Sequence, residues 1–398
     1  MYYRNIFASF ARYAYLVMMY LQLLQPVPRL TWLTSICRVV WIAWLIKPGY
    51  DVMHELYTET IEKLAYIVGS FLFVFKMLTN IAAYVESMCK TKHCQHLERL
   101  EIEVDALLRD YIDNAETLER KIWLKVFYSM LLQFVYDILQ LVLAFTCYMS
   151  PVFYYVVPML AIERARYAQI SLTIERQNAR ARSLIALLRL LVKANRPKHK
   201  YTSDVWQPYA AWEYESLNFL RLLQGRLCEL YQCVGDCYGW SITVLLFTTF
   251  FTVVANIFWC IEILSRGFRF GQFMYDALTM LRLSTLAVTL LITAEKTRQH
   301  NRQISGLIFK LAKPLGNKAY NDLVSDFSLQ CLHQPFMINV KGFFRLNLPL
   351  LGDLFALSIT YLIILMQFLM NEKINNKMTF KSKLIINATE ISTISPNF

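Results

Sequence analysis

The stretch Thr360-Tyr-Leu-Ile-Ile-Leu-Met-Gln-Phe368 lies near the C-terminal end of a long apolar run. On a helix, Thr360, Ile364 and Gln367 fall on one face, and Asn371 extends the same stripe. The amide of Gln367 is costly in hydrocarbon unless it meets water or a polar partner. Two interpretations remain open at this point. Gln367 lines a water-filled path shared by several subunits, or it bonds a neighbouring helix and holds the two helices together.

The composition of the whole chain indicates a polytopic helical membrane protein. Of its 398 residues, 56% are hydrophobic and 18% are charged, whereas a soluble domain carries roughly 25% charged residues. The net charge of +12 comes from basic residues between apolar runs, which favours contact with a membrane surface over nucleic acid. The nine cysteines fall mostly within or beside apolar segments and are expected to be reduced packing residues.

Seven apolar segments are long enough, or nearly long enough, to cross a hydrocarbon core of about 30 Å. The first is the weakest, because it is short and carries Arg38. A further apolar stretch, Tyr13–Leu24, is too short to span and is expected at the membrane interface. The predicted spans are Leu30–Ile46, Ile61–Val85, Val126–Met149, Val152–Ile174, Trp240–Leu264, Tyr275–Ala294 and Phe344–Met370.

The loop charges predict a cytosolic N-terminus and an extracellular C-terminus. The segments that this orientation places in the cytosol carry 27 Lys and Arg residues, against 7 in the outer segments. Basic residues concentrate on the cytosolic side of membrane proteins. The tail contains a glycosylation sequon at Asn387, which an extracellular C-terminus would expose to the lumen during synthesis. This orientation is the reverse of that of a G-protein-coupled receptor.

The cytosolic segments are predicted to contain long helices. Neither Gly nor Pro occurs between Gly69 and Pro151, so spans two and three are expected to continue as helices below the membrane. The uninterrupted stretch Met159–Arg196 would form a helix about 57 Å long. Two leucine stripes at helical spacing need protein partners, either within one subunit or between subunits. They comprise Leu184, Leu187, Leu188 and Leu191, and Leu220, Leu223, Leu227 and Leu230.

Charged residues inside the predicted spans need water or a partner, since each is costly in hydrocarbon. Lys76 and Asp137 either pair with each other or extend toward the interface. The other charges are Arg38, Glu163, Arg164, Glu262 and Arg282. Cys89, His93 and His96 share a helical face, but a structural zinc site needs four converging ligands, so no metal site is predicted. No catalytic motif or cofactor-binding loop is found, and no enzyme activity is expected.

Aromatic residues near the predicted outer ends of spans two to six form the candidate ligand pocket. They could bind small apolar or aromatic molecules, or they could form the aromatic belt that membrane proteins place at the interface. The candidates are Tyr66, Phe71, Phe145, Tyr148, Tyr154, Tyr155, Phe258 and Trp259, with Tyr275 at the same level.

The opening stretch resembles the signature of insect gustatory receptors. Thr360 and Tyr361, five apolar residues, then Gln367 and Phe368 match it in full, and the preceding Gly-Phe-Phe run in Gln334–Asn347 is also similar. The resemblance implies a ligand-gated, non-selective cation channel, assembled as a homo- or hetero-tetramer with other gustatory receptors around the seventh spans. It further implies a cytosolic anchor bundle and a tastant pocket in the outer half of spans two to six. The implied pore and gate residues are Thr360, Tyr361, Ile364, Gln367 and Phe368.

The expected organisation is an all-α membrane protein with seven transmembrane helices and a cytosolic helical anchor bundle. Residues 1–29 form a cytosolic or interfacial segment, 30–294 the six-span ligand-binding region, 295–343 the anchor segment, 344–371 the pore-lining span and 372–398 an extracellular tail. The resemblance implies the plasma membrane of a gustatory neuron, contact with membrane lipid and a small tastant, with bitter or aversive compounds as the family default. A metabotropic seven-span receptor and a transporter are the alternatives. The first has the reverse topology, and the second would often show inverted repeats and broken helices.

Overall fold

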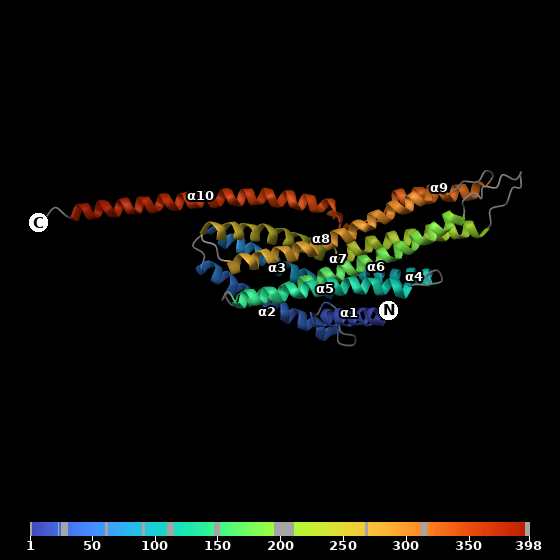
Figure 1. Ribbon diagram of the computed structural model, residues 1–398, viewed down its shortest axis with the longest axis horizontal. Coiled ribbons are helices and arrows are strands. Elements are labelled where there is room, and N and C mark those ends of the chain that lie inside the picture. The colour runs from blue at the N-terminus through green and yellow to red at the C-terminus, as the bar shows by residue number, and fades with distance from the viewer. Residues whose placement is uncertain are drawn as a thin grey trace.

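The computed structural model describes residues 2–22, 24, 31–59, 63–89, 92–109, 115–146, 152–194, 211–266, 270–311 and 317–394. Within these residues the chain is almost entirely helical, and most of its helices run along the axis of an elongated bundle (Figure 1). The all-α fold class is therefore confirmed. The helices that correspond to the predicted spans are α2 (Thr31–Glu59), α3 (Lys63–Met88), α5 (Ala115–Thr146), α6 (Val152–Ala194), α7 (Ala211–Arg266), α8 (Phe270–Ile308) and α10 (Pro349–Ile394).

Hydropathy alone separates these helices into two groups. Helices α3, α5, α7, α8 and α10 are long and apolar enough to cross a membrane, and α2 contains a shorter apolar stretch, Trp32–Trp44. The apolar run of α6 is interrupted by Glu163, Arg164 and Arg166, and none of these three side chains is exposed. Their charges are thus kept away from lipid by the surrounding helices, as charged residues within spans require.

Helix α6 is the central helix of the subunit. It packs against α3, α5, α7 and α8, and no described side chain between residues 159 and 181 is exposed. Its buried Asn178 donates to the carbonyl oxygen of Thr293 at 2.9 Å. The same amide accepts from the hydroxyls of Tyr231 and Thr297, at 3.0 and 3.1 Å. These bonds fix α6 relative to both α7 and α8, because a buried amide left without partners would be destabilising.

The two predicted leucine stripes pack into one core at the end of the bundle that the loop charges place in the cytosol. Helix α9 (Lys318–His333) and the end of α8 complete this core. Among the described residues, both stripes therefore find partners within a single subunit. The buried members are Leu184, Leu188 and Leu191 of α6 and Leu220, Leu223, Leu227 and Leu230 of α7, with Leu187 partly buried beside them.

The connection between spans two and three differs from the prediction. Helix α3 ends at Met88, and a separate helix, α4 (Lys92–Arg109), precedes α5. The expected continuation is wrong for span two, because α4 instead packs an apolar face against the same core, whereas span three does continue, since α5 begins at Ala115, eleven residues before the predicted start of the span. Arg180 of α6 adds ion pairs to Asp105 at 2.7 Å and Glu101 at 3.1 Å. The buried face of α4 consists of Leu97, Leu100, Val104 and Leu108.

A short hairpin connects α9 to α10. Strand β1 (Asn339–Val340) pairs antiparallel with β2 (Phe344–Arg345), and the turn residues Lys341 and Gly342 have φ angles of 50° and 81°. The predicted start of the seventh span at Phe344 is therefore too early, because backbone pairing places that residue in a strand. Helix α10 begins at Pro349, and the fixed φ of proline suits the first helical position.

The hairpin is seated on α7 at two glycines. A Cβ atom on Gly235 would lie 2.0 Å from the carbonyl oxygen of Asn339, and one on Gly239 would lie 2.4 Å from Cγ of Lys341. At Gly235 only glycine permits so close an approach of another backbone, whereas the neighbour of Gly239 is a lysine side chain. The hairpin, and with it the start of α10, is thereby held against α7.

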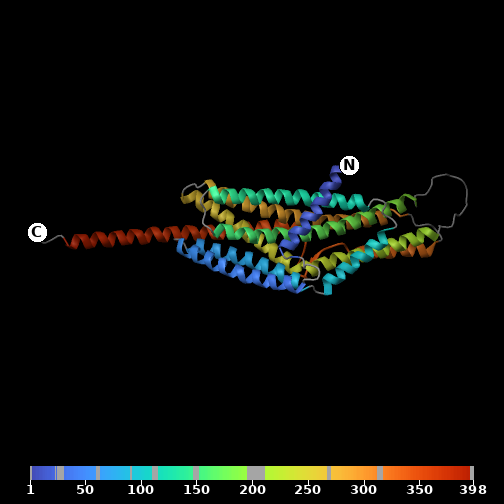
Figure 2. The ribbon, with the colours of Figure 1, turned by 90° about the horizontal axis from the view of Figure 1, so that it is seen from below.

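Two helices at the ends of the chain differ from the rest. Helix α1 (Tyr2–Leu21) crosses the bundle at a steep angle (Figure 2), and its interfacial position stays a prediction. Helix α10 continues to Ile394, beyond the predicted end of the span, and projects past the bundle (Figure 1). The side chain of Asn387 lies outside the described residues, so its glycosylation stays a prediction.

Candidate pore-lining helix and ligand pocket

Helix α10 packs against its own subunit through a narrow stripe. Of its described side chains, only Ser358 and Leu369 are buried. Leu362 and Leu365 lie between them at i+4 and i+7, on the same face. This face closes a small core formed by Val68 of α3 and by Ala255 and Phe258 of α7.

The predicted polar stripe lies on the opposite side of α10. Thr360, Ile364, Gln367 and Asn371 are all exposed on the single chain, and helical geometry separates them by roughly 180° from the packed stripe. The amide of Gln367 forms no hydrogen bond with another described residue of the subunit. If Gln367 joins helices, its partner is not among the described residues of this chain.

Tyr361 and Phe368 complete the sequence signature and lie in different surroundings. The ring of Tyr361 meets Phe250 of α7 edge to face, with 5.8 Å between the ring centroids and 76° between the planes. Such a contact contributes about 0.5–1.5 kcal/mol beyond area burial. Phe368 is 59% exposed and lies seven residues after Tyr361, on the same side of the helix and about 100° from Gln367. The tyrosine is therefore part of the attachment to α7, and the phenylalanine is not.

The predicted pocket aromatics are distributed unevenly. Phe258 is fully buried, and its ring contacts the half-buried Trp259, with 5.9 Å between centroids. Phe71 and Phe145 are 56% and 75% exposed on the single chain. The pocket stays a prediction, but Phe258 belongs to the same small core as Leu369 of α10. The side chains of Tyr66, Tyr148, Tyr154 and Tyr155 lie outside the described residues.

A ladder of polar contacts joins α5 to α8 inside the spans. Gln133 and Gln140 donate to the hydroxyls of Thr285 and Thr279, at 3.4 and 2.6 Å. These residues were not singled out above, although Gln133, Asp137 and Gln140 follow one another at i, i+4 and i+7. Three polar residues at this spacing in an apolar helix indicate a face turned away from lipid.

Asp137 lies in the middle of the ladder and pairs with two arginines. It accepts from Arg282 of α8 at 2.7 Å and also contacts Arg164 of α6. The Lys76–Asp137 pair is therefore not formed, because α6 and α8 bring both arginines to this carboxylate. Lys76 itself is buried on α3, so it does not extend to the interface either.

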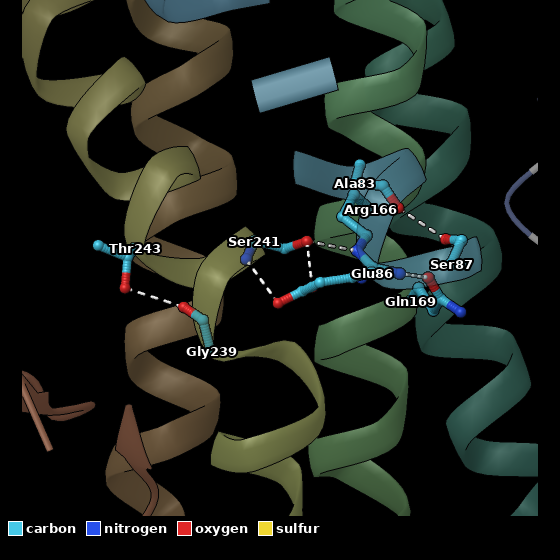
Figure 3. Close-up of polar contacts among 8 residues, drawn as sticks. All are labelled: Ala83, Glu86, Ser87, Arg166, Gln169, Gly239, Ser241 and Thr243. Carbon is cyan, nitrogen blue, oxygen red and sulfur yellow. Dashed lines mark hydrogen bonds and ion pairs between the residues drawn. The ribbon is translucent and has the colours of Figure 1, made fainter. Parts of the chain in front are cut away.

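A second polar cluster clamps α3, α6 and α7 together (Figure 3). Arg166 of α6 is 2% exposed and donates to Glu86 at 2.6 Å, to the Ser241 hydroxyl at 2.9 Å and to Gln169 at 2.7 Å. Glu86 also accepts from the backbone N–H of Ser241 at 3.1 Å and from its hydroxyl. The carboxylate and the guanidinium are thus neutralised by each other and by hydrogen bonds, as a buried ion pair requires.

The arrangement of the helices can now be compared with known proteins. The sequence pattern of the family described as 7tm Chemosensory receptor matches residues 9–372. The chain belongs to this family. The receptor is 31% identical over 206 residues to Gustatory receptor 23a of Drosophila melanogaster, covering 51% of this chain and 55% of that protein. It is 24% identical over 217 residues to Putative gustatory receptor 2a of the same species, covering 48% and 49%. The receptor thus matches about half the length of these curated relatives.

The fold of the receptor is similar to that of a solved insect olfactory receptor. Against the structure of OR5 from Machilis hrabei in complex with eugenol, the TM-score is 0.63 at 12% sequence identity, covering 91% of this chain and 99% of that one. The structure of OR5 described without eugenol gives a TM-score of 0.55 at 13% identity. At these identities the likeness shows the fold. The resemblance inferred from the last span is confirmed, and the receptor is a multi-pass membrane protein.

Proposed function

We propose that this chain is a gustatory receptor that acts as a ligand-gated, non-selective cation channel, with α10 of four subunits lining the pore. The observation that carries the proposal is the position of Gln367, exposed on the side of α10 opposite the face that packs on its own subunit. An amide in a membrane span needs water or a polar partner. Assembly of four subunits would enclose the stripe around an aqueous path and meet that need in every subunit.

The stimulus is a small tastant, with bitter or aversive compounds as the first class to test. The channel acts in the plasma membrane of a gustatory neuron, as a homotetramer or together with other gustatory receptors. The pocket lies among α3, α5, α6, α7 and α8. Phe258 and Trp259 give it a physical connection to the pore helix, because Phe258 packs in the same core as Leu369. A ligand that repacks Phe258 would change the support of α10 and shift the balance between closed and open states.

The test is a charge substitution at Gln367, in cells that express the full chain and are challenged with a panel of tastants. Gln367→Glu would add up to four carboxylates to a confined path, where they strengthen cation binding and favour divalent ions. Reversal potentials in monovalent and divalent solutions should shift while surface expression stays normal. Thr360→Val, on the same stripe, should change conductance more mildly.

The matched control is Gln303→Glu, the same change at an exposed residue of the cytosolic part of α8. It should leave permeation unaltered. Wild-type currents should also persist in excised patches without GTP, which separates a channel from a metabotropic receptor. A Gln367→Glu protein at normal surface level with unaltered permeability, rectification and block would remove Gln367 from the pore.

A further inference from the structure

A cavity of about 470 Å³ lies between α1 and the helices beneath it. Its volume is within the range of roughly 300–1,000 Å³ that is usual for small-molecule sites. Side chains from α1, α3, α4, α5, α6 and α7 line it, at the end of the spans that the loop charges place toward the cytosol. Glu86 and Arg166, whose clamp is drawn in Figure 3, are among its lining residues. The cavity is thus distinct from both the α10 stripe and the aromatic candidates for the tastant pocket.

Three arginines and three glutamates line the cavity, but their charges are not equally available. Glu86 is neutralised by Arg166, and Glu101 is neutralised by Arg180 at 3.1 Å and bonded by Gln177 at 2.6 Å. The third acid, Glu98, is exposed on α4. Arg12 and Arg176 form no ion pair with any described carboxylate. Two positive charges therefore remain for a ligand, which favours an anion.

Arg176 is held in place by a contact that leaves its N–H groups available. Its guanidinium lies over the ring of Trp123, with 5.6 Å from Cζ to the ring centroid. Stacking uses the face of the guanidinium, and the five N–H donors at its edge can still bind a phosphate in a bidentate manner. Trp123 is itself fixed by an edge-to-face contact with Tyr15, at 5.6 Å between centroids. The side chain is thereby ordered before a ligand arrives.

Tyr15 supplies a second observation that points to a ligand. It is only 5% exposed and lines the cavity, yet its hydroxyl forms no hydrogen bond with another described residue. Its oxygen is not sealed in the core and borders the space of the cavity. An anion in the cavity would accept this hydrogen bond.

The outer face of α1 indicates where the anion comes from. One face packs on the bundle through Ala8, Ala11, Tyr15 and Met19. The opposite face is apolar and exposed, at a spacing that places it along one side of the helix. Such a helix lies in the plane of the membrane interface with its apolar face in the acyl region. The exposed residues are Ile6, Phe10, Tyr13, Val17 and Leu21.

From these contacts we infer that the cavity beneath α1 binds the phosphate-bearing headgroup of an anionic phospholipid from the cytosolic leaflet. Arg12 and Arg176 neutralise the phosphate, and the Tyr15 hydroxyl donates a hydrogen bond to it. The acyl chains lie alongside the apolar face of α1. Bound lipid would join α1 to α6 and act as a structural cofactor from the bilayer.

The test measures lipid binding by the purified full-length receptor in phosphatidylcholine nanodiscs, with and without phosphatidylinositol 4,5-bisphosphate, by native mass spectrometry. Each arginine near an anionic headgroup contributes about fivefold in affinity, so Arg12→Gln with Arg176→Gln should weaken binding by about 25-fold. Tyr15→Phe, which keeps the ring contact with Trp123, should weaken binding a few-fold. The matched control is Arg189→Gln, an exposed arginine of the same helix α6 outside the cavity, which should bind like wild type.

Each outcome decides part of the inference. Wild-type lipid binding by a monodisperse, folded double variant would overturn it, and so would an equal loss in Arg189→Gln. If the double variant does not fold, Tyr15→Phe decides, and unchanged binding in that variant rejects the site. Soluble inositol trisphosphate should compete only weakly, because it lacks the acyl chains. Equal affinity for this soluble headgroup would reject a lipid in favour of a cytosolic phosphate compound. The assay needs no current, so its failure is separate from failure of the proposed channel.

Discussion

Helices α6 and α10 are of similar length, 43 and 46 residues, but their surroundings are opposite. Helix α6 carries glutamate, arginine, glutamine and asparagine through the centre of the subunit, and none of its described side chains from 159 to 181 is exposed. Helix α10 is apolar over its span, yet only Ser358 and Leu369 are buried among its described side chains. The more polar helix is inside and the more apolar one is outside.

This inversion follows from the solvent. In a bilayer, lipid tails accept apolar side chains as readily as a protein core does. The buried positions are therefore occupied by polar groups that need partners. Arg164 and Arg166, within the predicted fourth span, find those partners on α5, α3 and α7. Helix α10 has the same need at Gln367 and no partner for it among the described residues of the chain. Four substitution experiments test this contrast, each comparing a packed position with an open one.

The largest effect is expected from a charge in the core that contains the two leucine stripes. Leu188→Glu replaces a fully buried leucine of α6. The loss of stability should exceed the roughly 2–5 kcal/mol of a leucine-to-alanine truncation, because the variant also buries a carboxylate. Folded receptor should disappear from size-exclusion profiles and from the cell surface. Leu190→Glu, two residues away and 64% exposed, should behave like wild type. Equal losses in the two variants would show that α6 is not packed as described.

The next effect concerns the buried ion pairs of α5. Asp137→Asn leaves Arg164 and Arg282 without their counterion, and breaking a buried pair from one side is destabilising by about 3–5 kcal/mol. Thermal unfolding in detergent should shift to much lower temperature. Asp353→Asn makes the same change at an exposed residue of α10 and should leave the unfolding temperature nearly unchanged. An Asp137→Asn receptor as stable as wild type would contradict the ladder between α5 and α8.

A moderate effect is expected where the hairpin meets α7. Gly235→Ala places a methyl group 2.0 Å from the Asn339 carbonyl oxygen, and the forced shift should be destabilising by about 1–3 kcal/mol. Gly352→Ala on α10 meets nothing within 4 Å and should be stabilising by about 0.5–1 kcal/mol. Unfolding of the two purified variants measures the difference. A loss of stability in Gly352→Ala as large as in Gly235→Ala would show that α10 is packed as closely as α7.

The smallest effect depends on pH. Burial near the C-terminal end of α8, with a further contribution from Arg182, lowers the pKa of His300 from 6.5 to about 4. As the pH falls below 6.5, the unfolded chain takes up this proton first, so the stability due to neutral His300 is lost progressively between pH 6.5 and about 4. His300→Gln should therefore reduce the drop in unfolding temperature between pH 7 and pH 5. His333→Gln, at an exposed residue of α9, serves as the control. An unchanged pH dependence in His300→Gln would reject this role.

Part of the candidate site could be predicted from the sequence, because it depends on local spacing. The stripe of Thr360, Ile364 and Gln367 follows from helical periodicity alone, and the structure places it on one face. The partners of Asp137 could not be predicted in this way. They come from α6 and α8, which are 27 and 145 residues away in sequence, and only packing brings those helices to α5.

The sequence by itself determined the helical membrane class, most of the long apolar helices and the receptor family, because hydropathy, periodicity and a short motif are properties of neighbouring residues. The tertiary structure alone decided that α4 folds back, that the hairpin sits on Gly235 and Gly239, and that α6 is central. It also decided which faces of α1 and α10 are covered. These features depend on which helices lie side by side, and that choice is made by the summed burial of polar and apolar groups from distant parts of the chain.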